Sequence, residues 1–343
     1  MNRFHSIPTV TGPATRILPL LLAATLGCHC CGTKPAPDSP ATAPSAAAVE
    51  EHETLGSAAA PTQETFASPE QAAANLKEAV RDRDHAQLLQ IFGPDGEPLL
   101  FSGDRVQDDN RMSAFEQHMA EQLRVDHPTP DKAVLYIGAK NWPFPIPLVS
   151  DGSQWHFDTA AGKDEILDRR IGENELSTID AVNAVVRAEQ EYESRDRMGD
   201  KILQYAQRFR STPGKHDGLY WESTAPDDFS PMGALVADAE AEGYTGPPIK
   251  SHHQPYHGYY FHILTAQGPD AAGGQMDYLV NGKLIKGFAL IAYPAEWGNS
   301  GEMTFLVNQS GKIYQKDLGP QTTDVAAKIT DYDPDSTWEE VKE

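Results

Sequence analysis

Apolar residues along this chain follow a helical spacing in two stretches, and each of these stretches is followed by short runs with the alternation of β-strands. Helical spacing begins near Phe66, and strand-like runs bounded by Pro, Gly and Asp follow between residues 133 and 158. Helical spacing returns over residues 163–192, and the last third of the chain again carries strand-like runs. Helices followed by strands, each in its own stretch, indicate an α+β fold. We therefore predict two packed α+β units.

The first unit is expected over residues 66–170 and the second over residues 171–338. In the first, N-terminal helices precede a curved antiparallel sheet, a pattern like that of NTF2-like folds; in the second, a long helix precedes an antiparallel sheet. The stretch Ser68-Pro69-Glu70-Gln71 is a capping box that predicts a helix start, and Asp151-Gly152 predicts a hairpin turn. The stripe that we expect the long helix to bury consists of Leu176, Ile179, Val182 and Val186.

Residues 1–31 have the features of an export signal. Arg3 and Arg16 are the only charged residues before Cys28. The apolar run from Ile17 to Leu26 is shorter than the ~20 residues that span a bilayer. Such a segment is typical of a signal peptide rather than of a transmembrane helix. Its end, ATLGC, resembles a bacterial lipobox, so we predict a lipid on Cys28. The alternative is cleavage after Ala24 or Gly27 without lipid.

Residues 32–65 contain no aromatic residue and are rich in Ala, Pro, Ser and Thr. Such a segment cannot bury enough apolar surface to offset its ordering entropy, so we predict a flexible tether. An anchor followed by a tether predicts a protein of the cell envelope, lipid-anchored on the periplasmic side of the outer membrane. The alternative is a soluble periplasmic or secreted protein. Cys30 and Cys31 are the last cysteines, so we expect neither a disulfide nor a thiolate metal site in the folded part.

Acidic residues outnumber basic ones, 50 against 28, and the formal net charge is −22. Binding of nucleic acid requires a clustered positive surface, so nucleic acid is not expected as a partner. The same excess disfavours broad adhesion to anionic lipid head groups. We therefore expect contact with a membrane only through the lipid anchor.

Several stretches of the chain resemble the bacterial DUF2950 family, over nearly all of residues 66–338. They are NWPFPIPLV (141–149), WHFDTAAGKDEILDRRIGENEL (155–176), YAQRFRSTPGKHDGLYW (205–221), PYHGYYFHILTAQGP (255–269) and GFALIAYPAEWGNSGEMTFLVNQSGKIYQKDLG (287–319). The resemblance implies an exported bacterial protein of uncharacterised function, and it implies no activity. The helix and Gly-rich sheet of residues 172–320 are also faintly similar to the globular half of type IV pilins, which gives the expected pattern of the second unit.

The sequence contains no complete catalytic or cofactor motif. The turn at residues 196–200 has too few carboxylates for a calcium loop, and the four histidines between residues 252 and 262 have no obvious third type of ligand nearby. Ser211 and Ser300 lack the strand–Ser–helix context of a nucleophile elbow. We therefore predict no cofactor, no metal site and no catalytic residues, and we favour a protein that is not an enzyme.

Aromatic and basic residues in two segments suggest a ligand site. Trp142 and Phe144 stand between prolines, which stiffen an extended chain and exclude a central strand. A long mixed loop, residues 209–221, is the second segment. We predict a groove between the two, with these ligand-binding residues: Trp142, Phe144, Arg210, Tyr220 and Trp221. The alternative is that both segments only seal a seam between the units.

Two functions of different classes are compatible with these features. The first is an envelope-anchored, non-enzymatic binding or assembly module, whose partner is an envelope protein or a small anionic ligand. The second is a hydrolase that acts on a cell-envelope polymer through carboxylates between the two units. The absence of a catalytic motif favours the first.

Overall fold

The computed structural model of the protein describes residues 63–223, 225, 227–245 and 254–342. The predicted signal peptide, Cys28 with its predicted lipid, Cys30, Cys31 and the tether up to residue 62 lie outside the described residues. None of the described helices combines the length and the hydrophobicity that a membrane span requires.

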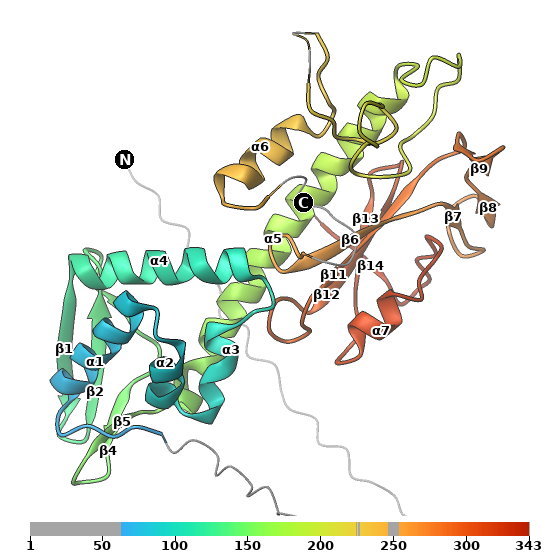
Figure 1. Cartoon of the computed structure of the whole chain (residues 1–343). Coiled ribbons are helices and arrows are strands. Elements are labelled where there is room, and N and C mark those ends of the chain that lie inside the picture. Colours follow the sequence, from blue (N-terminus) through green and yellow to red (C-terminus); the bar gives the residue numbers. More distant parts are fainter. Residues whose placement is uncertain (1–62, 224, 226, 246–253, 343) are drawn as a thin grey trace, which may run out of the picture. The chain divides into compact units, whose positions relative to one another are not determined.

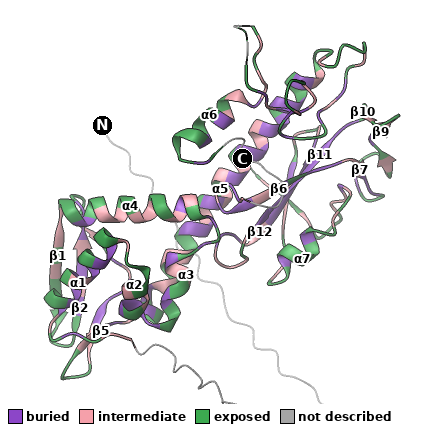
Figure 2. Ribbon diagram, viewed as in Figure 1, coloured by how far each residue is buried: buried purple, intermediate pink, exposed green. Residues whose placement is uncertain are grey.

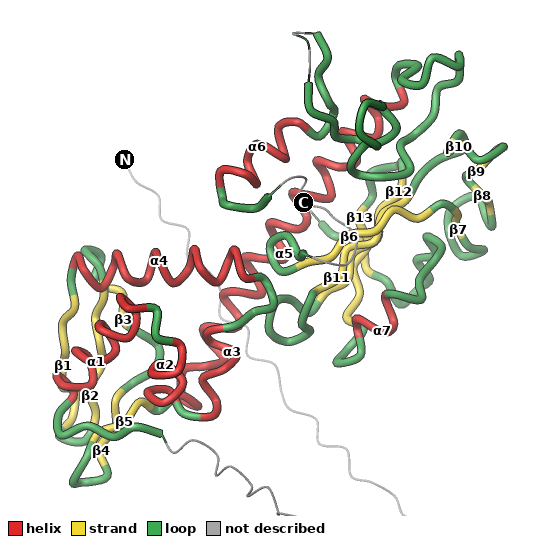
Figure 3. The backbone as a smooth tube through the Cα atoms, in the orientation of Figure 1, coloured by secondary structure: helices red, strands yellow, loops and turns green. Residues whose placement is uncertain are grey.

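The fold is α+β, as predicted, with helices and antiparallel sheets in the described residues (Figures 1 and 3). The helices are α1 (Pro69–Asp82), α2 (His85–Phe92), the 3-10 helix η1 (Pro94–Gly96), α3 (Glu97–Leu100), α4 (Arg105–Glu121), α5 (Thr159–Glu193), α6 (Gly233–Ala241) and α7 (Thr322–Ala326). The strands of the N-terminal half are β1 (Leu123–Thr129), β2 (Lys132–Ile137), β3 (Trp142–Pro143), β4 (Leu148–Ser150) and β5 (Trp155–Phe157). The strands of the C-terminal half are β6 (Tyr259–Leu264), β7 (Ala266–Gln267), β8 (Met276–Asp277), β9 (Leu279–Val280), β10 (Lys283–Leu284), β11 (Ala289–Pro294), β12 (Met303–Asn308), β13 (Ile313–Asp317) and β14 (Glu339–Glu340).

The N-terminal helices begin where the capping signals place them. Ser68 is the N-cap of α1 and its side chain accepts from the amide of Gln71, while the Gln71 side chain accepts from the amide of Ala67. The first bond is the one that a capping box predicts, and the second reaches the amide of the residue before the N-cap instead of that of Ser68 itself. Asp84 caps α2 in the same way, by accepting from the amide of Gln87.

The N-terminal sheet has the strand order β1-β2-β4-β5, with β3 beside β2. The predicted hairpin at Asp151-Gly152 joins β4 to β5, and the Asp151 carboxylate accepts from the amides of Ser153 and Gln154. Hydrophobic side chains of α1, α2 and this sheet form one buried cluster. The cluster draws on Leu76, Leu88, Ile91, Leu135, Ile146, Leu148 and Phe157, among others.

Residues 63–65, the last three of the predicted tether, are fixed to the fold, so the prediction of a flexible segment was wrong for them. The Gln63 side chain donates to the carbonyl oxygens of Ile91 and Phe157, and the amide of Glu64 donates to the carbonyl of Gln90. These bonds tie residues 63–65 to the end of α2 and to β5.

Helix α5 spans 35 residues and runs without a break through the predicted boundary near residue 170. Its start lies directly against the chain before β4, because a Cβ on Gly162 would be 2.4 Å from the carbonyl oxygen of Pro145. Only glycine allows this approach. The described residues belong to one compact unit, and the division into two units stays a prediction.

The buried face of α5 differs from the predicted stripe. Val182 and Val186 are buried and Ile179 is half-buried, but Leu176 is 68% exposed, so its prediction was wrong. The buried residues of α5 include five with polar side chains, which a search for an apolar stripe does not find. The buried residues are Thr159, Gly162, Arg170, Ile171, Asn174, Thr178, Ala181, Val182, Val185, Val186, Ala188, Glu189 and Tyr192.

The C-terminal sheet has the strand order β14-β13-β12-β11-β6 and is antiparallel throughout. All six residues of β11 are buried, since a central strand is covered on both faces. Figure 2 shows buried residues along β11, β12 and part of α5. These elements form the second hydrophobic cluster, which includes Tyr259, Phe261, Phe288, Phe305 and Leu306.

Candidate binding pocket

A cavity of about 250 Å³ lies among α1–α5 and the segment after β3. Two helices supply most of its wall at positions that share one helix face, spaced i, i+3, i+4 and i+7. From α4 these are Asp108, Arg111, Met112 and Phe115, and from α5 they are Ile166, Arg169, Arg170 and Glu173. The rest of the lining is Val80, Leu88, Phe92, Leu99, Leu100, Trp142 and Phe144.

One end of the cavity is aromatic. The Phe144 ring lies 5.5 Å from the ring of Phe115, 6.2 Å from that of Phe92 and 6.0 Å from that of Trp142. The Arg169 guanidinium lies over the Trp142 ring, with its central carbon 5.6 Å from the ring centroid. The rings pack against one another and form one side of the cavity, where they can contact the apolar part of a ligand.

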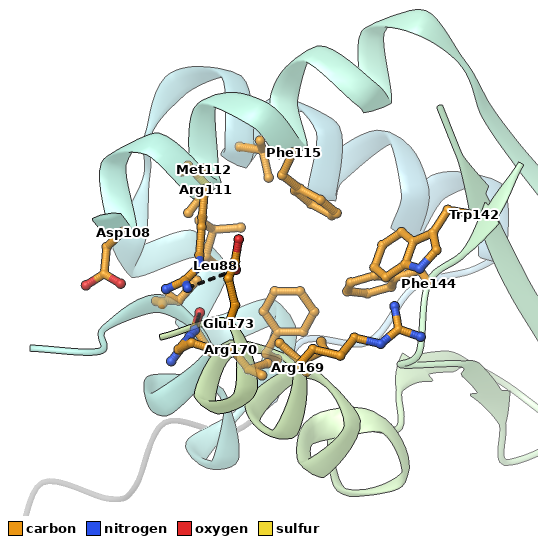
Figure 4. A pocket seen from close by; sticks show the side chains of 15 residues that line it. Leu88, Asp108, Arg111, Met112, Phe115, Trp142, Phe144, Arg169, Arg170 and Glu173 are labelled. Carbon is orange, nitrogen blue, oxygen red and sulfur yellow. Dashed lines mark hydrogen bonds and ion pairs between the residues drawn. The ribbon is translucent and has the colours of Figure 1, made fainter. Parts of the chain in front are cut away.

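Charged side chains gather at the other end of the cavity (Figure 4). Arg111 donates to the side-chain oxygens of Gln107 at 2.8 Å and Asn174 at 3.0 Å, and to the Glu173 carboxylate at 3.2 Å. Glu173 is 69% exposed, so its pair with Arg111 is a surface ion pair, of a kind that contributes about 0–1 kcal/mol.

Arg170 is only 5% exposed and bonds to neutral oxygens. Its Nη1 donates to the carbonyl of Pro98 and to the side-chain oxygen of Asn299, both at 2.6 Å, and its Nη2 donates to the carbonyl of Leu99 at 2.8 Å. None of the described residues supplies a hydrogen-bond partner for its Nε. Burial, and then the neighbouring charge of Arg111, lower the pKa of Arg170 to about 10, so the side chain stays protonated at neutral pH.

Asp108 is the other acidic residue of the lining. Its carboxylate accepts from the amide of Ser102 at 2.9 Å and from the Ser102 hydroxyl at 2.6 Å. Burial raises the pKa of Asp108, against the lowering effect of these hydrogen bonds. Ser102 thus holds the Asp108 carboxylate, and no ion pair joins Asp108 to either arginine among the described residues.

The residues predicted to form a ligand site lie in different clusters. Trp142 and Phe144 line the cavity and belong with the N-terminal cluster. Trp221 and Tyr220 belong with the C-terminal cluster, and none of residues 209–221 lines the cavity. Ligand binding by Arg210, Tyr220 and Trp221 stays a prediction, and we build the candidate site without them.

The loop that holds Trp221 is tightly bonded within itself. The Trp221 ring is buried, stacks on the His216 ring at 4.3 Å and donates from Nε1 to Asp228 at 2.9 Å. Arg210 is half-exposed and pairs with the Glu222 carboxylate at 3.2 Å. These contacts give Trp221 a structural role and leave Arg210 on the surface.

The lining of the cavity contains no Ser, Thr, Cys, His or Lys. Its two carboxyl groups, Asp108 and Glu173, are therefore the groups of the lining that could act as a nucleophile or as a general acid or base. Among the described residues, no group of three or more His, Cys, Asp or Glu side chains is placed to hold a metal ion.

The cationic end of the cavity was not predicted from the sequence. Arg111 and Arg170 stand on two helices far apart in the chain, and neither lies in an aromatic or glycine-rich segment. The shared i, i+3, i+4, i+7 spacing of apolar and charged residues on α4 and α5 is the signal that could have found them.

Comparison with known proteins gives one match. A protein-family model, described as a protein of unknown function (DUF2950), matches residues 63–341. No curated protein and no solved structure matches the chain. The expected likenesses of the two units to NTF2-like folds and to pilins therefore stay analogies of pattern.

Proposed function

Since the chain belongs to the DUF2950 family, whose description names no activity, we propose a function from the cavity itself: the protein is a binding module for one small molecule with an apolar body. The observation that carries this proposal is an open, largely apolar space of about 250 Å³ with an aromatic wall. Small-molecule sites in proteins are typically concave and mostly apolar, with a few polar groups that fix the orientation of the ligand.

The size of the cavity supports an occupant larger than a single aromatic ring. An engineered apolar cavity of ~150 Å³ binds benzene in another protein. A cavity of about 250 Å³ therefore suits a chain or ring system of roughly eight to twelve heavy atoms.

The chemistry of the lining favours binding over the hydrolase alternative. The two carboxylates there already have partners, since Ser102 holds Asp108 and Arg111 pairs with Glu173. The raised pKa of Asp108 is a feature of a general acid, but the second carboxyl group of the lining, Glu173, is bound by Arg111.

We further propose that the binding module is carried at the cell envelope. The support is the signal-like segment of residues 1–31, the lipobox-like end at Cys28 and the composition of residues 32–62. Replacing Cys28→Ser is expected to abolish labelling by a fatty acid in the producing bacterium and to release the protein from the membrane fraction. Equal labelling of the variant would contradict the anchor and leave the soluble periplasmic or secreted protein.

The binding proposal is tested with a neutral probe, 1-octanol, by NMR titration of the backbone amides. We expect saturable shifts of amides in α2, α4 and the segment around Phe144. Met112→Trp places a larger side chain in the cavity and is expected to weaken binding about tenfold or more. Met198→Trp is the matched control, since Met198 is 44% exposed and lies outside the lining. Equal binding by the two variants, or shifts confined to other regions, would contradict the proposal.

A further inference from the structure

We infer that the molecule bound in this cavity is an amphipathic monoanion, with a carboxylate-type head group against Arg111 and Arg170 and its apolar body against the aromatic end. The inference rests on the proposed function and specifies its ligand. Four observations carry it.

The first observation is the sign of the charge on the lining. Three guanidinium groups line the cavity against two carboxyl groups, in a chain whose formal net charge is −22. One of the three, Arg169, lies over Trp142 at the aromatic end and pairs with Glu165. The end that holds Arg111 and Arg170 also holds two carboxyl groups, so an anion there would be held by the directed N–H donors of the arginines rather than by net charge.

The second observation is the state of Arg170. Within the described part of the chain, no carboxylate lies within ion-pair distance of its guanidinium, although the residue is only 5% exposed. Three of its five N–H groups bond to neutral oxygens, and its Nε has none of the described atoms as a partner. The charges of Asp108 and Glu296 act on Arg170 from beyond ion-pair distance. Burying a cation without a direct counter-charge is costly. An anion at this end of the cavity would offset that cost.

The third observation is that Arg111 can exchange its partner. Its bonds to Gln107 and Asn174 hold the guanidinium in place, while its one carboxylate partner, Glu173, is mostly exposed. A ligand carboxylate could replace Glu173, which would turn back to water at little cost. A planar guanidinium offers paired donors that match the two oxygens of a carboxylate.

The fourth observation is the direction of the cavity. Figure 4 shows Asp108, Arg111, Arg170 and Glu173 at one end, and the rings of Trp142 and Phe144 with the Arg169 side chain at the other. Since Arg169 is paired with Glu165 and covers the Trp142 ring, the rings offer apolar contact at that end. A charged head and an apolar body together match the two ends. Asp108 stands beside the cationic end, and its carboxyl group would repel a second negative charge, which favours a monoanion over a phosphate dianion.

The experiment compares four ligands of equal chain length by calorimetry: octanoate, 1-octanol, octylamine and octyl phosphate. We expect octanoate to bind about tenfold tighter than 1-octanol, with octylamine weakest, because charge-assisted hydrogen bonds favour the anion. Added salt should weaken the binding of octanoate and leave the affinity for 1-octanol nearly unchanged. Equal affinities for octanoate and 1-octanol would overturn the inference while leaving the proposed function intact; binding of none of the four would overturn the proposed function.

Variants assign the head group to the arginines. Arg111→Met is expected to remove the preference for octanoate over 1-octanol, and Arg111→Lys, which keeps the charge without the planar fork, to reduce it. Arg105→Met is the control, because Arg105 lies on the same helix with a side chain that is 95% exposed. If Arg111→Met does not fold, Arg111→Lys decides, and an unchanged preference in that variant would contradict the assignment. Tighter binding of octyl phosphate than of octanoate would overturn the inference that the ligand is a monoanion.

Discussion

Arg170 Nη1 donates to the side-chain oxygen of Asn299 at 2.6 Å, and this bond joins α5 to the loop between β11 and β12. The Asn299 amide in turn donates to the carbonyl of Phe101 at 2.7 Å and to the Glu296 carboxylate at 2.8 Å. A loop of the C-terminal half thereby holds both a lining arginine and the end of α3. The cationic end of the cavity depends on residues outside its wall.

Replacing Asn299→Ala is expected to lower the free energy of unfolding by about 1–3 kcal/mol, because a further N–H group of the buried Arg170 would lose its partner. Denaturant unfolding measures this. Asn75→Ala is the control, since the Asn75 side chain makes one long hydrogen bond of 3.4 Å to Glu64. Equal effects of the two substitutions would show that the bond to Arg170 contributes little.

The buried face of α5 predicts which substitutions the helix tolerates. Val185 is fully buried and Val185→Ala should cost about 1–3 kcal/mol, whereas Val185→Asp should prevent folding. Leu176→Asp should change stability by less than about 0.5 kcal/mol, because Leu176 is exposed. Thermal unfolding of the three variants tests which face of α5 is buried. A severe loss of stability in Leu176→Asp would mean that Leu176 lies on the buried face.

Glu189 makes the stability depend on pH. Complete burial raises the pKa of Glu189 well above its ordinary value, and only Oε2 has a partner, the amide of Ala206. Between the unfolded and folded pKa values the folded state alone binds this proton, so stability falls as pH rises through that window and is highest below it. Glu189→Gln should remove this fall and be more stable than the unaltered protein at the upper end of the window.

Unfolding curves measured across a series of pH values test this effect. Glu193→Gln is the control on the same helix, and it should keep the slope of the unaltered protein. A Glu189→Gln protein with the same slope would show that another group causes it.

The loop around Trp221 offers a test of the ligand site predicted from the sequence. Trp221→Ala should cost about 3–5 kcal/mol, because the ring is buried and stacked on His216. Arg210→Ala should change stability by less than about 0.5 kcal/mol. Neither should alter the affinity for octanoate in variants that remain folded. If Arg210→Ala lowers the affinity for octanoate without lowering the stability, the loop that holds Arg210 takes part in ligand binding.

Local signals predicted much of the fold. The capping box at Ser68 and the hairpin at Asp151-Gly152 both depend on bonds between near neighbours, and the structure has both. Helix α6 was missed because it starts at Gly233 and its N-cap, Met232, makes no side-chain capping bond. Strand β1 was missed because charged residues and a proline interrupt its alternation.

The candidate site was only half predictable. Trp142 and Phe144 stood out because prolines flank them, which is a property of the sequence itself. The helical spacing around Arg111 and Arg170 places each arginine on one face of its helix, but the cavity that these two faces line depends on how α4 and α5 pack against α2 and α3. Leu176 was misplaced for a related reason: the true buried face of α5 continues through Asn174, Thr178 and Glu189, and polar residues conceal it from a search for an apolar stripe.

The most direct test of the account is a crystal structure with 8-bromooctanoate, in which anomalous scattering locates the bromine. The account predicts a bromine peak among the rings of Phe92, Phe115 and Phe144, and carboxylate density within hydrogen-bond distance of Arg111. A well-occupied ligand with its bromine outside the cavity, or with its carboxylate at the aromatic end, would contradict it.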